Sequence, residues 1–167
     1  SITIIVIGDD KVGKTSFMNC IINNDFKEHL LIPTSEIKDY YLPVVLNNDK
    51  KTFIRFRDTP DINYLQNNIQ NIANNVNYQL VLLIFDKSNV QSFNNIDQYV
   101  NLIRSHMKSK IMIIGNKMDS PDCTVTYSMV KSKSKQLNAD FFEISSFKST
   151  NIEMVYDKII STMNESN

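Results

Sequence analysis

The feature that most constrains this chain is a strand-like run that passes through a glycine-containing loop into a helix-like segment. The run Ile2 to Ile7 is apolar or β-branched, the segment Ser16 to Asn23 is amphipathic, and between them lies Gly8-Asp9-Asp10-Lys11-Val12-Gly13-Lys14-Thr15. At such a turn, successive backbone N–H groups and the helix N-terminus converge on an anion. The stretch predicts a phosphate-binding loop, although by itself it leaves ATPases, kinases and GTPases open.

Each residue type in this loop suits phosphate chemistry. Gly8 and Gly13 permit a tight turn, Lys14 is expected to reach the β- and γ-phosphates, and the Thr15 hydroxyl is expected to coordinate magnesium. A chance glycine turn followed by Lys-Thr is the alternative, and the flanking strand and helix argue against it. The predicted phosphate-binding residues here are Gly8, Asp10, Lys11, Val12, Gly13, Lys14, Thr15 and Ser16.

A second stretch, Asn116-Lys117-Met118-Asp119, indicates which base is bound. It follows an apolar strand, and therefore lies at the carboxyl edge where open α/β sheets bind ligands. The Asp119 carboxylate can accept hydrogen bonds from guanine N1–H and the exocyclic amine, whereas adenine would leave it unpaired. Asn116 would donate to the base edge and tie loops together, and the Lys117 stem can lie over the ring. A polar loop with a surface lysine is the alternative, but the two stretches together predict GTP/GDP and Mg²⁺ as cofactors.

Composition excludes several classes of function. The 18 basic and 18 acidic side chains balance, which argues against nucleic acid as the main partner. Cys20 and Cys123 show no metal-ligand spacing and favour a reducing, cytoplasmic compartment. The sequence contains no run of about 18 apolar residues, so no segment suggests a membrane span.

The order of segments predicts one domain over residues 1–167. Strand-like and helix-like patterns alternate, and Asn47 to Lys50 reads as a tight hairpin that makes one strand antiparallel. We expect an α/β fold with a doubly wound, mostly parallel six-stranded sheet and helices on both faces. The predicted strands are 2–7, 38–46, 51–57, 79–85, 110–115 and 140–144, and the predicted helices are 14–24, 64–77, 91–107, 125–137 and 151–164.

With these stretches in view, the chain resembles the Ras superfamily of small GTPases along its whole length. The resemblance rests on the phosphate loop, Pro33-Thr34, Asp58-Thr59, Asn116 to Asp119 and Glu143-Ile144-Ser145-Ser146. Gly8-Asp9, the stretch Asp86 to Asn95 and the following Tyr99 are similar to the Rab branch.

The resemblance implies a GDP/GTP switch with further site residues. Thr34 would close onto magnesium and the γ-phosphate, Asp58 would hold magnesium through a water, and Phe26 would pack against the base. The guanine-binding residues implied in all are Phe26, Asn116, Lys117, Asp119, Ser145, Ser146 and Phe147, where Phe147 replaces a common lysine.

One motif departs from the family pattern. The family has Asp-x-x-Gly and then a glutamine that orients the attacking water, but this chain reads Asp58-Thr59-Pro60-Asp61-Ile62. Ile62 cannot hydrogen bond to water, the Asp61 carboxylate repels a triphosphate, and Asp10 adds further negative charge in the phosphate loop. Only Lys14 and Thr34 remain as transition-state support, so no catalytic residue is assigned.

The function expected from sequence is a Rab-like GDP/GTP-dependent switch in vesicle trafficking that hydrolyses GTP slowly. A pseudo-GTPase scaffold that holds nucleotide without cycling is the alternative, and rescue of the water position by Asn63 is left open. An ATP-using P-loop enzyme has little support, because Asp119 selects guanine.

Partners and location follow from the resemblance. We expect exchange factors, GTPase-activating proteins and effectors, a monomer, and a cytoplasmic protein that is peripheral on endomembranes through a lipidated C-terminal tail. The sequence ends at Ser166-Asn167 without such a tail. We expect a chain trimmed at both ends, with a protein that never had the tail as the alternative. Arg57 and the stretch Ser35 to Asp39 do not match the usual Rab effector-facing sequence.

Overall fold

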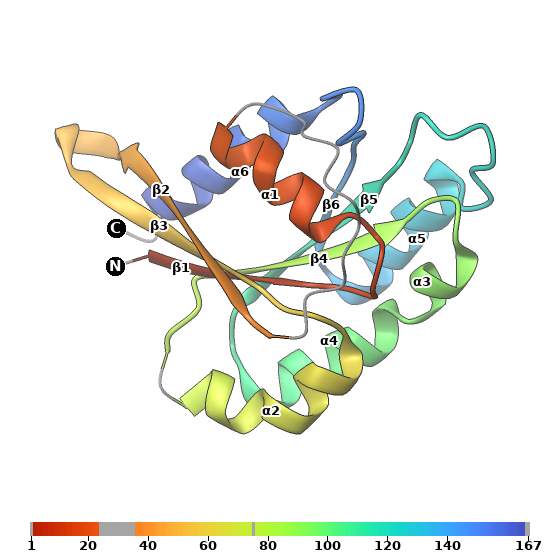
Figure 1. Ribbon diagram of the computed structural model, residues 1–167, viewed down its shortest axis with the longest axis horizontal. Helices are drawn as coiled ribbons and strands as arrows, with labels where there is room; N and C mark the ends of the chain where they lie inside the picture. Colours follow the sequence, from red (N-terminus) through yellow and green to blue (C-terminus); the bar gives the residue numbers. More distant parts are fainter. Residues whose placement is uncertain (1, 24–35, 75, 166–167) are drawn as a thin grey trace.

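The computed structural model describes residues 2–23, 36–74 and 76–165, and it shows a six-stranded sheet between two layers of helices (Figure 1). The strand order is β2-β3-β1-β4-β5-β6, and every neighbouring pair is parallel except β2 and β3. The predicted doubly wound, mostly parallel sheet with one antiparallel strand is confirmed. The strands are β1 (Ile2–Ile7), β2 (Lys38–Val45), β3 (Lys51–Asp58), β4 (Leu80–Asp86), β5 (Lys110–Asn116) and β6 (Asp140–Glu143). The helices are α1 (Lys14–Asn23), the 3-10 turn η1 (Asn47–Asp49), α2 (Ile62–Asn74), α3 (Val90–Asn94), α4 (Ile96–His106), α5 (Tyr127–Leu137) and α6 (Ile152–Glu165).

The central strands bury both of their faces. All residues of β1 and β4 are buried, because alternate side chains point to opposite sides of the sheet and helices cover both sides. Ile4 and Val6 join the apolar cluster under α1 and α6, whereas Ile5 and Ile7 join the cluster under α2 and α4. Figure 1 shows these two helix pairs on opposite sides of the sheet. This double cover fixes the carboxyl ends of β1, β4 and β5 side by side, where the loops of interest begin.

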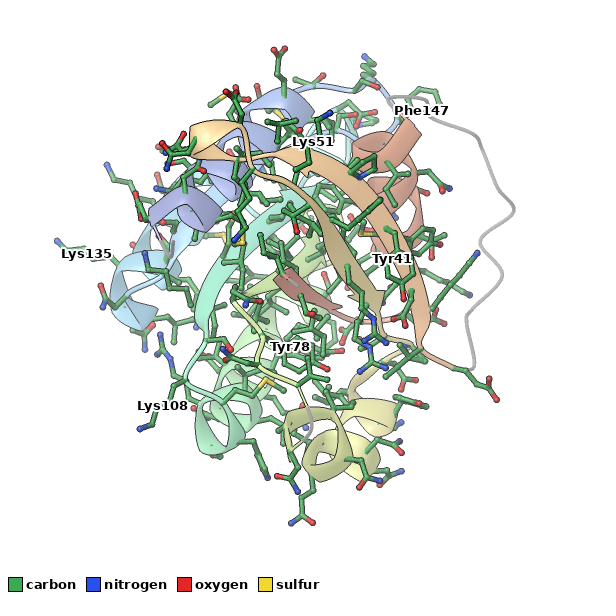
Figure 2. All side chains as sticks on the ribbon, turned by 90° about the vertical axis from the view of Figure 1, so that its left-hand side faces the viewer. Tyr41, Lys51, Tyr78, Lys108, Lys135 and Phe147 are labelled. Atoms are coloured by element: carbon green, nitrogen blue, oxygen red, sulfur yellow. The ribbon has the colours of Figure 1, made fainter. Side chains whose placement is uncertain are left out.

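The hairpin between β2 and β3 turns where the sequence predicts it. Asn48 and Asp49 adopt the left-handed conformation, with φ of 66° and 57°, and the Leu46 N–H donates to the Lys50 carbonyl at 2.9 Å. Strand β2 forms one edge of the sheet and contains Pro43, while the opposite edge strand, β6, has only four residues. Tyr41 projects from the outer face of β2 (Figure 2).

Several helix boundaries differ from the sequence prediction, and local caps explain most of them. The predicted helix 91–107 is two helices, because Asn95 ends α3 and its side chain turns to Asp9 of the phosphate loop. Helix α2 begins at Ile62 instead of residue 64, after Asp61, and ends at Asn74 instead of residue 77. Helix α5 begins two residues later than predicted, since Thr126 caps it through Met129 N–H at 3.3 Å.

Candidate functional site

The phosphate loop lies between the end of β1 and the start of α1, as the sequence predicts. Its glycines occupy backbone conformations that other residues rarely adopt, with φ of 147° at Gly8 and 95° at Gly13. A Cβ atom on Gly8 would collide with the Ile84 carbonyl oxygen, and one on Gly13 with the Asn116 side-chain amide. The loop is therefore closely packed against the neighbouring strand ends, and neither glycine position has room for a side chain.

Lys14 holds a buried ammonium group inside this loop. Its Nζ donates to the carbonyls of Gly8 at 2.9 Å and Asp9 at 2.7 Å. Burial lowers the pKa of Lys14, and the nearby carboxylates, led by Asp58 and Asp10, oppose that shift. A cation fixed in this way presents its charge to a phosphate at little further cost in ordering.

Thr15 and Asp58 form a pair of oxygen groups next to Lys14. The Thr15 hydroxyl donates to Asp58 Oδ2 at 2.9 Å, and Asp58 Oδ1 is buried without a hydrogen-bond partner among the described residues. Burial raises the pKa of Asp58, against the influence of Lys14 and Thr15. Residues 2–23, 36–74 and 76–165 contain no cluster of three or more His, Cys, Asp or Glu side chains suited to a metal. The pair fits magnesium, which keeps several waters and binds through one or two protein oxygens together with substrate phosphates.

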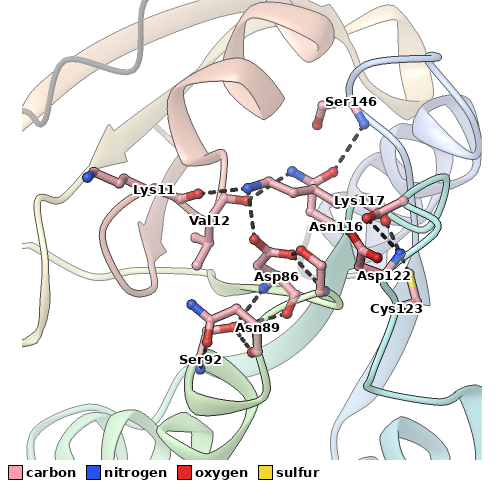
Figure 3. Close-up of polar contacts among 12 residues, drawn as sticks. Lys11, Val12, Asp86, Asn89, Ser92, Asn116, Lys117, Asp122, Cys123 and Ser146 are labelled. Carbon is pink, nitrogen blue, oxygen red and sulfur yellow. Dashed lines mark hydrogen bonds and ion pairs between the residues drawn. The ribbon is translucent and has the colours of Figure 1, made fainter.

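Asn116 joins three loops at the end of β5. Its Nδ2 donates to the Val12 carbonyl at 3.0 Å, and its Oδ1 accepts from the Ser146 N–H at 3.1 Å (Figure 3). The side chain is only 2% exposed. The phosphate loop and the two loops predicted to bind guanine are thus held in one arrangement by a single buried amide.

Asp119 is oriented by the loop that follows β6. The Ser145 hydroxyl donates to Asp119 Oδ1 at 2.6 Å and accepts from the Lys148 N–H at 3.0 Å. Backbone hydrogen bonds between Ser145 and Thr150 close this loop into a compact turn. The carboxylate keeps acceptor capacity for a base edge, as guanine selection requires. Phe147 lies at the surface with 62% of its area exposed (Figure 2).

The Ras family pattern matches residues 3–165. This chain belongs to the Ras family. It is 25% identical over 162 residues to "Ras-related protein Rab-3" of Caenorhabditis elegans, which covers 94% of this chain and 71% of that protein. It is 27% identical over 169 residues to "Ras-related protein Rab-7b" of Paramecium octaurelia (93% and 78% covered) and 25% identical over 157 residues to "Ras-related protein RabH" of Dictyostelium discoideum (93% and 77%).

The family match and the Rab names of these relatives identify the chain as a Rab-like small GTP-binding protein. Ras-family GTPases in general bind guanine nucleotides with Mg²⁺ and work with regulators and effectors. Within the part of the chain that the structure describes, no helix has both the length and the apolar character needed to cross a membrane. Thr34 and Phe26, which the resemblance places at magnesium and at the base, lie outside the described residues.

In this Ras-family chain, Lys117 connects the base-binding loop to the phosphate loop and to β4. Its Nζ donates to the Lys11 carbonyl at 3.0 Å and pairs with Asp86 Oδ2 at 2.8 Å (Figure 3). Asp86 Oδ1 accepts from the backbone and hydroxyl of Ser88. Sequence reasoning gave Asp86 no role beyond likeness to Rab proteins. Its position at the end of a buried strand, beside the strand that carries Asn116, is the signal that could have identified it.

Asp9 also has contacts that the sequence analysis did not foresee. Its Oδ2 accepts from Asn95 Nδ2 at 2.7 Å and its Oδ1 from the Tyr99 hydroxyl at 2.9 Å. All three residues carry the likeness to the Rab branch, and the fold brings them together across 86 and 90 positions of sequence.

The residues after Asp58, where the sequence departs from the pattern of small GTPases, make specific contacts with β1 and α2. Thr59 donates through its N–H and hydroxyl to the Val6 carbonyl, at 3.1 and 2.8 Å. Asp61 Oδ1 accepts from the Tyr64 N–H at 2.9 Å and so caps α2, a role not predicted from sequence. Ile62 is partly buried against the apolar cluster under α2 and α4, and Asn63 is exposed. Ile62 therefore contributes to packing at the position where the resemblance to small GTPases leads us to expect a water-orienting side chain.

Proposed function

We propose that this chain is a Rab-like GDP/GTP-dependent switch of vesicle trafficking with slow intrinsic hydrolysis. The observation that carries the proposal is the buried Asn116 amide, which joins the phosphate loop to both base-binding loops. Holding these loops together suits a single ligand that carries both phosphates and a guanine base. The Rab names of the relatives support the trafficking role.

The proposed roles follow the geometry of the site. The loop backbone, Lys14 and Ser16 would hold the phosphates, Thr15 and Asp58 would hold magnesium, and Asp119 would select guanine. Bound magnesium would neutralise charge that develops on the transferred phosphoryl group. Ser145 and Ser146 would offer backbone donors to the base, and Ser146 N–H is already used by Asn116. The Ser145 N–H likewise donates to the Thr150 carbonyl at 3.2 Å, so both backbone donors already have protein partners.

Slow hydrolysis is supported by the surroundings of Ile62. An apolar side chain packed on the core can neither position water nor turn toward it without losing buried area. Asn63 is the polar alternative in the same segment, and it is exposed in the first turn of α2, whose start is capped by Asp61. We expect hydrolysis several orders of magnitude slower than in relatives that have the glutamine.

The experiment is a single-turnover assay on the chain loaded with GTP and magnesium, after the bound nucleotide has been identified. Phosphate release far below that of a glutamine-containing Rab protein measured in parallel is the expected result. Ile62→Gln should raise the rate if water positioning is the missing element, and Asn67→Gln, at an exposed position in the same helix, serves as the control. Release at the relative's rate contradicts slow hydrolysis, and failure to bind GDP or GTP contradicts the proposal as a whole.

A pseudo-GTPase scaffold is the second candidate. The observation in its favour is the structural use of Asp61 and Ile62, which ties the segment after Asp58 into α2. Nucleotide held without turnover or exchange would select this candidate. In either case we propose a single domain over residues 1–167 that works as a monomer with exchange factors, activating proteins and effectors. A cytoplasmic location with peripheral attachment to endomembranes belongs to the same proposal.

A further inference from the structure

Lys87 directly follows β4, and its buried side chain lies between the two loops predicted to bind guanine. The residue is only 7% exposed, and its Nζ forms an ion pair with the Glu143 carboxylate at the end of β6. Its N–H donates to the Asn116 carbonyl at 3.0 Å, and its carbonyl accepts from the Val125 N–H at 3.0 Å. Lys87 therefore contacts the residues at which both base-binding loops begin, and Val125 ties it to the segment that follows Asp119.

The side chain of Lys87 reaches Glu143 by crossing strand β5. This strand lies between β4 and β6, and neighbouring strands are about 4.8 Å apart, so the two backbones that the pair connects are about 10 Å apart. The crossing point is Gly115, which is in register with Phe85 on one side and with Glu143 on the other. A Cβ atom on Gly115 would lie 3.2 Å from Lys87 Cγ and 2.9 Å from the Phe85 ring. The lysine stem thus passes over a position of β5 that carries no side chain.

Glu143 directly precedes the loop that orients Asp119. The Ile144 carbonyl accepts from the Met118 N–H at 3.0 Å, and the Ser145 hydroxyl donates to Asp119 Oδ1 at 2.6 Å. Only Ile144 separates Glu143 from Ser145 in the chain. A shift of Glu143 is therefore passed on to the hydroxyl that orients the Asp119 carboxylate.

The residue before Lys87 contacts the other base-binding loop with the opposite charge. Asp86 Oδ2 accepts from Lys117 Nζ at 2.8 Å (Figure 3). Two consecutive residues after the buried part of β4 thus form ion pairs with residues of β6 and of the Asn116 loop. Because a buried charge without its partner is costly, the pair of Lys87 and Glu143 resists separation more strongly than an exposed pair would.

We propose that Lys87 is a positioning residue for base recognition, because its ion pair with Glu143 across Gly115 fixes the spacing of the two base-binding loops. Loss of this link should loosen the contact of Asp119 with the exocyclic amine of guanine. Contacts of the phosphate loop should change much less, since no atom of that loop takes part in the link. The effect on guanine rests on the proposed function, but the link between β4 and β6 does not.

Competition between GDP and inosine diphosphate (IDP) tests this inference, because inosine lacks only the exocyclic amine of guanine. Lys87→Met keeps the length of the side chain and removes its charge. We expect it to lower the ratio of GDP to IDP affinity at least about fivefold, which is less than the roughly 10- to 100-fold value of a whole hydrogen bond to a charged group. Lower stability of the whole chain would weaken both nucleotides alike and leave the ratio unchanged.

Lys133→Met is the matched control. The same substitution there removes the ion pair of Lys133 with Asp97, which joins α5 to α4, and it should leave the ratio of GDP to IDP affinity unchanged. Lys133 is also largely buried, with 17% of its side chain exposed, so the two variants lose charges in comparable surroundings.

A double variant separates positioning from charge balance. Lys87→Met/Glu143→Leu leaves neither member of the pair as an unpaired buried charge, and apolar residues of similar volume often replace a buried ion pair without loss of stability. We expect the ratio of GDP to IDP affinity to stay low in this variant. A ratio equal to that of Lys133→Met would mean that the pair only balances charge. If Lys87→Met does not fold, the double variant decides.

Hydrogen exchange without nucleotide tests the link independently of nucleotide binding. Amides of 116–119 and 144–148 should exchange at least about threefold faster in the double variant than in Lys133→Met. The inference is overturned if the exchange rates there equal those of the control, or if the double variant keeps a ratio of GDP to IDP affinity within about twofold of the control. Binding of neither nucleotide would refute the proposed function instead, and the exchange rates would still decide whether Lys87 holds the loops.

Discussion

Replacing Asn116 with alanine is the sharpest test of the arrangement at this site. The change removes the partner of two backbone groups, the Val12 carbonyl and the Ser146 N–H, while the amide itself is 2% exposed. A buried polar group left without a partner costs about 1–3 kcal/mol, so two such groups set a range of about 2–6 kcal/mol. Water that enters the space of the lost amide recovers part of this, and we expect about 2–4 kcal/mol.

This free energy should appear mainly as faster nucleotide release, because the two orphaned groups belong to the loops that we propose to hold opposite ends of the ligand. At 1.4 kcal/mol per factor of ten, GDP should dissociate about 30- to 10³-fold faster. The assay follows displacement of a fluorescent GDP derivative by excess unlabelled GDP in the presence of Mg²⁺. Asn101→Ala, at an exposed asparagine on α4, is the control and should leave the rate unchanged. A GDP dissociation rate for Asn116→Ala within threefold of the control would refute the role of Asn116 in holding the loops together.

Three other substitutions test separate parts of the structure. Asp119→Asn should weaken GDP binding by several orders of magnitude and improve binding of xanthosine diphosphate, whose C2 carbonyl suits an amide donor; competition binding checks both, and retained guanine preference would argue against a base contact at Asp119. Gly13→Ala places a Cβ against the Asn116 amide at a φ of 95°, so GDP binding should fall at least tenfold, and unchanged affinity would show that the loop adapts. Asp61→Ala removes the cap of α2 and should lower the free energy of unfolding by about 1 kcal/mol in urea titrations, whereas Asp61→Asn should retain most of it.

The sheet and the phosphate loop were predictable because their signals are local. Each central strand is a short apolar run with a turn on either side, and the loop between β1 and α1 carries its own glycines. The break between α3 and α4 was not predictable in this way. Residues 91–107 have a helical pattern throughout, and the contact of Asn95 with Asp9 depends on how the sheet brings distant segments together.

The residues of the candidate site also separate into those that a local sequence pattern predicts and those whose contacts depend on the fold. Asn116, Asp119 and Lys14 stand in recognisable stretches, and the structure places them on neighbouring loops. Asp61 could also have been predicted as a cap, since an aspartate directly before a helix is a local capping signal. Tyr99 could be recognised as buried from its helical spacing, but its hydroxyl partner, Asp9, comes from a distant segment of the chain.

The edges of the sheet have a consequence for how this protein behaves at high concentration. An exposed edge strand offers unpaired backbone groups to which a strand of another molecule can add, which is a common start of aggregation. In edge strands proline usually sits where its missing N–H would face solvent, so Pro43 interrupts the row of donors along β2. At the other edge, the four residues of β6 are too few for a long template and begin and end with a carboxylate. Both edges are thereby weakened as templates, and molecules of this chain should join strand to strand less readily than molecules with long, uninterrupted edge strands.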